Sequence, residues 1–328
     1  MQLEVTIETF ESFAELWNRG ARTLRWSCPF VLPPWLETWW RSFGGGRTPL
    51  LLAVKEQGRV LGIAPLMIEG GEARFMGSEN ICDYMDCTVA AGRGRECFQA
   101  LLPFLRQEGV RTLDLGPVRG DSVVVADLVP AARDLGCEIL CRPEEVTVER
   151  DLPATWDDFL ALLSGKERHE IRRKMRRLET AGAVRFRVID DEAGVRPGME
   201  TFLTLFMRNR PEKRDFMTGQ MSSFFRALAE SLARLAGGVL RLSILEIDGV
   251  PAAAVMCLDY GSTVYLYNNG YDGRFASLSV GFLSKVLTIR DGIDRGREKY
   301  EFLKGGEPYK LRLGGRPVPL HRCRVGLR

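Results

Sequence analysis

Three polar side chains near the C-terminus have the chemistry that a direct group transfer requires. In the segment KYEFLKGGEPYKLRLGG, a strand-like run ends at paired glycines, and Glu307, Tyr309 and Lys310 follow within a few residues. The glycines allow the backbone to turn sharply at that point. A carboxylate can accept the proton of an incoming nucleophile, a phenol can protonate a leaving group, and a cation can orient an anion. We predict that these three residues are catalytic; the alternative is a turn with a local ion pair.

A second candidate site lies where a predicted helix begins. The segment YDGRFASLSVGFLSKV reads as a strand end, a short polar loop and an apolar-periodic helix. Unpaired backbone N–H groups at a helix start, reinforced by the helix dipole, can hold a pyrophosphate. A serine that merely caps the helix is the alternative. The residues assigned to this site are Arg274, Ser277, Leu278, Ser279, Val280 and Gly281, with Asn269 and Tyr271 on the preceding strand as substrate-binding candidates.

A strongly basic helix is predicted from the segment KERHEIRRKMRRLE. Ile171, Met175 and Leu178 form one apolar stripe at helical spacing, and arginines occupy most of the remaining surface. Arg172 and Arg176 are candidate ligands for an anionic substrate, whereas the alternative is a solvated face balanced by neighbouring glutamates. No recognised DNA-binding pattern accompanies the arginines, which argues against duplex binding.

The elements that must position these groups occur twice along the chain, over residues 50–116 and 240–305. In each copy a two-residue turn joins consecutive apolar strands, and a helix then leads to a further strand. The turns are Gln57-Gly58 and Asp248-Gly249. The pattern predicts an α/β (α+β) fold with two domains in tandem, each a mixed, mostly antiparallel sheet flanked by helices.

The domain boundary is expected near residue 150, because Pro153 and the acidic run at residues 142–145 interrupt the pattern there. The predicted domains are therefore residues 1–150 and 151–328, a length that suits two average domains. Helices are expected between residues 155 and 236. The aromatic run Trp35, Trp39, Trp40 and Phe43 has helical spacing, which favours core packing over an acceptor groove.

Composition narrows the classes of function. Lys and Arg number 46 against 43 Asp and Glu, so net charge does not select nucleic acid or an anionic membrane as partner. The N-terminus carries acids where a secretory signal would be basic and apolar, and no apolar run is long enough for a membrane span, so a soluble cytoplasmic protein is expected. The eight cysteines are scattered without a CxxC motif, which suits reduced thiols, and no metal is expected. Signatures of covalent serine catalysis and of nucleotide-binding loops do not occur.

The chain resembles the GNAT acyltransferase superfamily, in the tandem-domain branch labelled CelD-like or BioF2-like that is found with cellulose and exopolysaccharide biosynthesis. The stretches PFVLPPWLETWWRSFG, ENICDYMDCTV, RRKMRRLE and KYEFLKGGEPYKLRLG carry the likeness, and the last is the most specific. The superfamily's coenzyme A signature aligns with Arg274 to Ser279, with serine at both small positions. The resemblance implies acetyl-CoA or another acyl-CoA as donor, a degenerate first domain, and Asp83 and Tyr84 as acceptor contacts.

The function expected from these features is N- or O-acyl transfer to a sugar, lipid-linked or amine acceptor, in exopolysaccharide or cell-envelope biosynthesis. Two alternatives stay open. The tandem arrangement is also similar to the Fem-type aminoacyltransferases, which would make aminoacyl-tRNA the donor. The chain could also be a non-catalytic module of a polysaccharide-assembly system, in which the basic helix binds an acidic partner. The sequence leaves the acyl group, the acceptor and the oligomeric state open.

Overall fold

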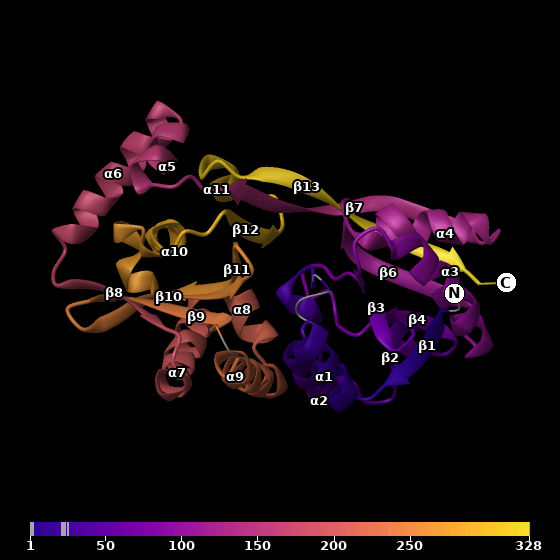
Figure 1. The fold of residues 1–328 in the computed structure, drawn as a ribbon. Coiled ribbons are helices and arrows are strands. Elements are labelled where there is room, and N and C mark those ends of the chain that lie inside the picture. The colour runs from indigo at the N-terminus through magenta and orange to yellow at the C-terminus, as the bar shows by residue number, and fades with distance from the viewer. Residues whose placement is uncertain (1–2, 21–23, 25, 236, 328) are drawn as a thin grey trace. The chain divides into compact units, whose positions relative to one another are not determined.

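The computed structural model describes residues 3–20, 24, 26–235 and 237–327. These fall into two compact units, coloured by chain position in Figure 1. Unit 1 comprises Met1–Val146 and Val318–Arg328, and unit 2 comprises Thr147–Pro317. The division lies close to the predicted residue 150. The C-terminal segment differs from expectation, because it belongs with unit 1 and not with the second domain.

Unit 1 is built on a mixed sheet with the strand order β1-β2-β3-β4-β6-β13, and β5 pairs with β3. Strands β4 and β6 pair in parallel, whereas β1 with β2, β2 with β3, β3 with β4, β3 with β5 and β6 with β13 pair antiparallel. The strands are β1 (Glu4–Glu8), β2 (Thr48–Glu56), β3 (Arg59–Glu69), β4 (Glu72–Phe75), β5 (Thr88–Val89), β6 (Thr112–Arg119) and β13 (Arg316–Gly326). The helices are α1 (Phe10–Gly20), a 3-10 turn (Pro29–Val31), α2 (Pro33–Phe43), α3 (Gly94–Gln107), a π-helical turn (Val124–Leu128) and α4 (Val129–Asp134).

The aromatic run of α2 packs in the core of unit 1. Trp35 and Trp39 are buried, and the Trp35 ring meets Phe30 edge to face with ring centroids 4.9 Å apart. The prediction that these aromatic residues serve core packing is confirmed for both tryptophans.

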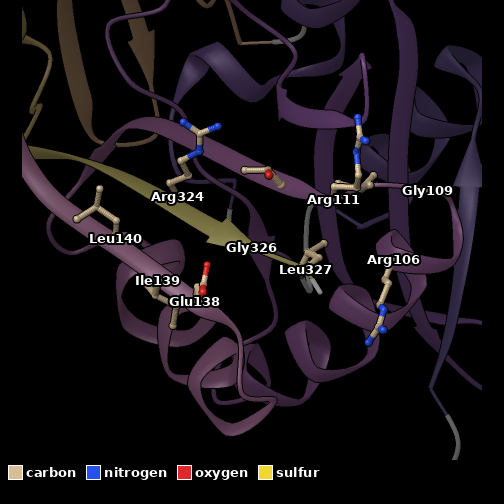
Figure 2. A pocket seen from close by; sticks show the side chains of 11 residues that line it. Arg106, Gly109, Arg111, Glu138, Ile139, Leu140, Arg324, Gly326 and Leu327 are labelled. Atoms are coloured by element: carbon tan, nitrogen blue, oxygen red, sulfur yellow. The ribbon is translucent and has the colours of Figure 1, made fainter.

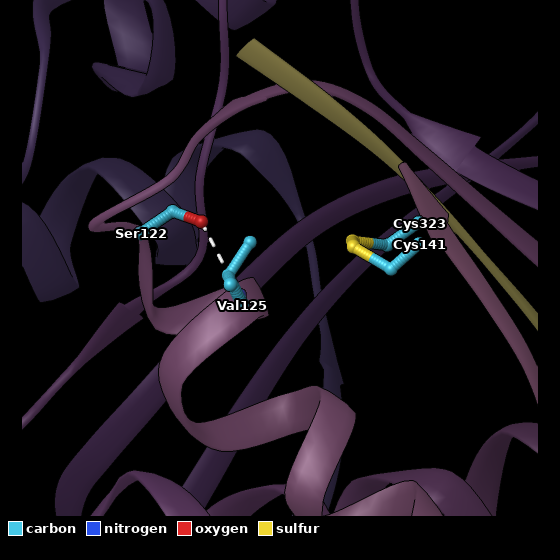
Figure 3. Close-up of a disulfide and its surroundings, with 4 residues drawn as sticks. All are labelled: Ser122, Val125, Cys141 and Cys323. Carbon is cyan, nitrogen blue, oxygen red and sulfur yellow. Dashed lines mark hydrogen bonds between the residues drawn. A yellow bond between two sulfur atoms is a disulfide. The ribbon is translucent and has the colours of Figure 1, made fainter. Parts of the chain in front are cut away.

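Strand β7 (Glu138–Asp151) contributes residues to both units, and its Cys141 forms a disulfide with Cys323 of β13 (Figure 3). The expectation that all the cysteines are reduced thiols is therefore wrong for this pair. The two residues are 182 positions apart in the sequence, so no local spacing could reveal the pairing. The other six cysteines are free, and five of them are buried: Cys28, Cys82, Cys87, Cys97 and Cys257.

Unit 2 is built on strands in the order β7-β12-β11-β10-β9-β8. Helices α7 and α9 lie on one face of the sheet and α10 lies on the other (Figure 1). The strands are β8 (Val184–Ile189), β9 (Leu240–Ile247), β10 (Val250–Tyr260), β11 (Thr263–Tyr271) and β12 (Lys299–Lys304). The helices are α5 (Trp156–Leu162), α6 (Gly165–Glu179), α7 (Glu192–Asn209), α8 (Pro211–Phe216), α9 (Gly219–Ala233), a 3-10 turn (Gly273–Leu278), α10 (Val280–Asp294) and α11 (Pro308–Arg312).

The internal repeat is confirmed element by element. Strands β2, β3 and β4, helix α3 and strand β6 of unit 1 correspond in order to β9, β10 and β11, α10 and β12 of unit 2. Both hairpin turns have positive φ at their two central residues, 51° and 77° at Gln57 and Gly58, and 50° and 76° at Asp248 and Gly249. Such turns match the twist of the flanking strands, which explains why the short Xaa-Gly signal predicted them.

No helix in the ranges that the structure describes is both long and apolar enough to cross a membrane.

Candidate functional site

The site is organised by two strands of unit 2 that pair only where they begin. Strands β11 and β12 are parallel over three residue pairs, from Thr263 with Lys299 to Tyr265 with Glu301. Beyond Tyr265, β11 continues to Tyr271 without pairing to β12. The predicted groups on the loop after β11 and on the segment after β12 therefore follow the ends of two strands that separate.

A bulge bends β12 at this separation. The register shifts between Glu301 and Leu303, and Leu303 has a φ of 62°, a left-handed conformation that is unusual for a bulky side chain. The buried carboxylate of Glu301 accepts hydrogen bonds from the Thr147 hydroxyl at 2.5 Å and from the Leu303 backbone N–H at 3.3 Å. These bonds hold the strained backbone in place, and strain of this kind is concentrated at functional sites.

Lys310 anchors the end of the bulged strand. Its side chain is buried, and its ammonium donates to the backbone carbonyls of Leu303, Lys304 and Gly305 at 2.7–2.9 Å. The same ammonium lies 2.8 Å from a carboxylate oxygen of Glu307. Its N–H donors are thus directed at protein acceptors. This arrangement positions the strand end and Glu307, and leaves no donor for orienting a bound anion.

Glu307 and Tyr309 flank the start of α11. The Glu307 side chain is 55% exposed and therefore accessible to a substrate. The ring of Tyr309 meets Phe302 edge to face at 6.4 Å between centroids. Burial, reinforced by the negative charge of Glu307, raises the pKa of Tyr309 well above its usual range. The phenol consequently stays protonated at neutral pH and can act as a proton donor.

A buried lysine that was not predicted from the sequence lies beside Tyr309. Lys285 of α10 donates to the Gly281 carbonyl at 2.6 Å, and its ammonium lies 5.0 Å from the centre of the Tyr309 ring. Burial, together with the positive charge of Lys213, lowers the pKa of Lys285 to about 7. A lysine within the apolar run VGFLSKVLTI is the one sequence signal that could have revealed it.

Lys213 of α8 is a second amine that the sequence did not indicate, and its side chain is half-buried. Its ammonium donates to the backbone carbonyl of Asn269 on β11, and it lies 4.6 Å from the Phe206 ring centre. Burial and the charge of Arg210 lower its pKa to about 8. Three lysines therefore donate to backbone carbonyls of this site: Lys213 to β11, Lys285 to the first turn of α10, and Lys310 to β12.

The start of α10 has an open first turn. Ser279 occupies the N-cap position with a φ of 57° and makes no side-chain cap, so the alternative reading of this serine as a conventional cap is not supported. The ring of Tyr271 packs closely on Gly281, where an added Cβ would lie 2.5 Å from the ring. Arg274 is 68% exposed and pairs with Asp272 at 2.7 Å. Ser277 is exposed, and Leu278 is half-buried.

The remaining predicted residues lie elsewhere. Tyr84 of unit 1 is buried, with its ring 5.7 Å from that of Phe30 and 5.7 Å from the Arg119 guanidinium. It thus contributes to the packing of unit 1, while its neighbour Asp83 is half-buried. Arg172 and Arg176 are exposed on α6 and line a groove of about 750 Å³.

A pocket of similar size, about 730 Å³, lies in unit 1 and contains none of the predicted residues (Figure 2). Arg106, Arg111, Arg324 and Glu138 are among its lining side chains. Arg324 is paired with Glu72 at 3.0 Å, and Arg111 donates to the Gly70 carbonyl at 2.9 Å. The guanidinium groups of Arg324 and Arg111 are therefore already engaged by acceptors of the protein itself. Among the described residues, no cluster of three or more His, Cys, Asp or Glu side chains could hold a metal ion.

Comparison with known proteins gives a family match within unit 2. Residues 165–311 match the model described as an acetyltransferase (GNAT) domain. No curated protein sequence matches the chain.

Solved structures with the same fold include FemX, at 14% identity and a TM-score of 0.66, covering 98% of this chain and 96% of FemX. A second is the C-terminal domain (DUF2156) of a putative lysylphosphatidylglycerol synthetase from Agrobacterium fabrum, at 11% identity and a TM-score of 0.60, covering 97% and 92%. A third is a tandem GNAT protein from the clavulanic acid biosynthesis pathway, at 13% identity and a TM-score of 0.51, covering 98% of both chains. These likenesses confirm the tandem GNAT fold. Residues 165–311 thus match the model of a GNAT acetyltransferase domain, and the whole chain has the fold of a tandem GNAT protein.

Proposed function

We propose that the chain transfers an acyl group from acetyl-CoA or a related acyl-CoA directly to an amine or hydroxyl of a sugar, lipid-linked or amine acceptor. The observation that carries this proposal is the open first turn of α10, placed where β11 and β12 separate and lying within the residues that match the GNAT model. A place in exopolysaccharide or cell-envelope biosynthesis is the setting that the sequence resemblance suggests.

The residues at this turn fit a coenzyme A pyrophosphate. The backbone N–H groups of Val280 and Gly281 lie at the positive end of a 15-residue helix, and no side chain caps them. The exposed guanidinium of Arg274 and the hydroxyl of Ser277 supply further donors. Asn269 and Tyr271 precede the turn on β11 and are our candidates for contacting the substrate.

The thioester would supply the acyl carbon, and side chains of the protein would transfer the protons of the reaction. Glu307 accepts the proton of the attacking amine or hydroxyl, and Tyr309 donates a proton to the departing thiolate. Lys310 acts on these groups by positioning, since it fixes both the strand end and the Glu307 carboxylate. Backbone N–H groups near the strand separation would stabilise the oxyanion without a covalent enzyme intermediate.

A second candidate function is aminoacyl transfer from aminoacyl-tRNA. It is favoured by the fold shared with FemX over nearly the whole chain. In this case the basic helix α6 would contribute to salt-sensitive tRNA binding. A third reading, a non-catalytic module of a polysaccharide-assembly system, predicts that neither donor is consumed.

Substitution of Glu307 by Gln tests the proposed role of this residue. We expect Glu307→Gln to lower acyl transfer at least about 100-fold, because a general base contributes roughly 10²–10⁴-fold. The thermal midpoint should fall only slightly, since the Glu307 side chain is 55% exposed and Lys310 keeps its three backbone carbonyl acceptors. The measurement is thiol release from acetyl-CoA in the presence of amino-sugar, sugar and amine acceptors.

The matched control is Glu298→Gln, which removes another exposed carboxylate of unit 2 and should retain full activity. Full activity in Glu307→Gln would exclude the base role. If the wild type consumed aminoacyl-tRNA and left acetyl-CoA intact, the aminoacyl-tRNA reading would replace the proposed one.

A further inference from the structure

The groove along α6 combines an apolar floor with a cationic rim. It has a volume of about 750 Å³ and is formed by α5, α6 and α10. The apolar lining residues are Trp156, Leu160, Ile171 and Met175. The cationic lining residues are Arg168, Arg172, Arg176 and Arg290, with His169 beside them and Glu179 at the C-terminal end of α6.

The arginines of α6 form a regular row. Arg168, Arg172 and Arg176 are spaced by four residues, so they share one face and rise by about 6 Å per step. In the part of the chain that the structure describes, no carboxylate forms an ion pair with Arg172 or Arg176. The nearby carboxylate of Glu170 is engaged by Arg173 at 2.9 Å and by Lys174 at 3.3 Å. The groove therefore has positive charge that the protein itself does not neutralise.

The row of arginines runs toward the start of α10. Leu178, near the end of α6, belongs to the same buried cluster as Val280 and Leu283. Lys174 lies 4.7 Å from the ring centre of Phe282. The groove thus lies beside the helix that carries the proposed donor site, on a separate surface of α6.

We propose that this groove binds the phosphate group of an anionic lipid and brings unit 2 to a membrane surface. Arg172 and Arg176 would bind the phosphate together, and the half-buried side chains of Trp156 and Met175 would contact the adjoining lipid chain. Leu162, at the end of α5 and 68% exposed, would enter the interface beside them. Basic side chains next to exposed apolar ones are the combination that binds an anionic bilayer surface. The inference goes beyond the proposed function and does not depend on which donor is used.

A nucleic acid fits the groove less well, because the ring of its tryptophan already stacks on another aromatic side chain. The Trp156 ring stacks on Phe159 with centroids 5.0 Å apart and planes 12° from parallel. The Arg290 guanidinium lies 5.9 Å from the Trp156 ring centre. Single-stranded nucleic acids rely on aromatic faces open to their bases, and this ring is already packed.

Vesicle flotation tests the proposal with the full-length protein. The vesicles contain phosphatidylcholine alone, or phosphatidylcholine with one quarter phosphatidylglycerol. We expect binding to the mixed vesicles only, and Arg172→Gln with Arg176→Gln should weaken it about 30-fold if each arginine contributes the usual amount. The matched control is Arg173→Gln with Arg177→Gln, which removes the same charge from the same helix outside the groove and should weaken binding much less.

Several outcomes would overturn the proposal. An equal loss of vesicle binding in both double variants would mean that the vesicles are attracted by the total charge of α6 and not by the groove. Displacement from the mixed vesicles by soluble glycerol phosphate, or tighter binding to RNA than to the vesicles, would assign the groove to another ligand. The thermal shift produced by coenzyme A must be the same in Arg172→Gln/Arg176→Gln as in the wild type, since a smaller shift would place the groove in the donor site. Failure of the wild type to show any coenzyme A shift would instead count against the proposed function alone.

Discussion

At the scale of single residues, the candidate site is distinguished by lysines whose ammonium groups donate hydrogen bonds to backbone carbonyls. Lys310, Lys285 and Lys213 each donate to a main-chain carbonyl close to the point where β11 and β12 separate. From the sequence, Glu307 and Tyr309 are candidates because of their chemical type. The sequence could not show that Lys310 is buried, because exposure depends on contacts made by the folded chain.

Replacing Lys285 by Met should make stability less dependent on pH. The pKa of Lys285 is lowered from 10.5 to about 7, so between these values the folded protein binds fewer protons than the unfolded chain. The destabilisation from burying the charge is complete below pH 7 and disappears as the pH rises toward 10.5. Lys285→Met should therefore gain stability relative to the wild type below pH 7, and lose that gain near pH 10.5.

Urea unfolding across this pH range measures the effect. The variant keeps the charged neighbours Lys213, Glu307, Arg210 and Lys310. Its stability should therefore still rise with pH, with a smaller slope that comes from Lys213. Lys166→Met, which removes an exposed lysine of α6, should show no such change with pH. If the free energy of unfolding differed between Lys285→Met and the wild type by the same amount at every pH, burial would not lower the pKa of Lys285.

At the scale of elements, the junction between β11 and α10 departs from its usual chemistry. Ser279 adopts a left-handed conformation with a φ of 57° at a position where the superfamily signature has a small residue. A side chain costs roughly 1–2 kcal/mol in that conformation, and glycine avoids this penalty. The fold tolerates the serine, which also leaves less room for a pyrophosphate to approach the backbone.

Ser279→Gly should tighten coenzyme A binding several-fold. Stability should change by less than about 1 kcal/mol, because relief of strain is offset by the greater freedom of glycine in the unfolded chain. Calorimetric titration with coenzyme A measures the affinity. The control Ala276→Gly, in the preceding 3-10 turn, should lose about 0.5–1 kcal/mol of stability with no gain in affinity. Weaker binding by Ser279→Gly would contradict the assignment of this turn.

Elements with a local signal were predicted, and those determined by distant contacts were not. The Xaa-Gly hairpins and the amphipathic helix α6 follow from turn chemistry and apolar spacing. Strand β8 is an exception, because its sequence VRFRVI alternates apolar and charged residues as a strand does, yet it lies in a region that was expected to be helical. The bulge at Leu303 had no signal, since leucine is not a residue that marks a left-handed backbone.

At the scale of the whole molecule, the last strand belongs to the unit that contains the N-terminus. Strand β13 pairs with β6 and buries Leu320, Cys323 and Val325 in unit 1. The sequence suggested two consecutive domains, because repeat patterns show the order of elements and not the partner of a terminal strand. Each buried aliphatic side chain contributes roughly 1.5–3 kcal/mol, so this segment supplies much of the stability of unit 1.

Removing residues 318–328 should therefore expose β6. We expect hydrogen exchange to lose the protection of backbone amides in Thr112–Arg119, because the β13 partners and the buried side chains are gone. Arg324→Gln removes one exposed side chain of β13 and should retain that protection. Unchanged protection in the truncated protein would mean that unit 1 does not depend on its C-terminal strand.

Thermal unfolding with millimolar coenzyme A or acetyl-CoA is the first test of the proposal that unit 2 holds an acyl-CoA donor at the start of α10. A ligand that binds only the folded state must raise the midpoint. We predict a clear rise with both ligands, accompanied by slower hydrogen exchange at residues 273–283. No rise at these concentrations would rule out this donor site and favour a tRNA-linked donor or a non-catalytic role.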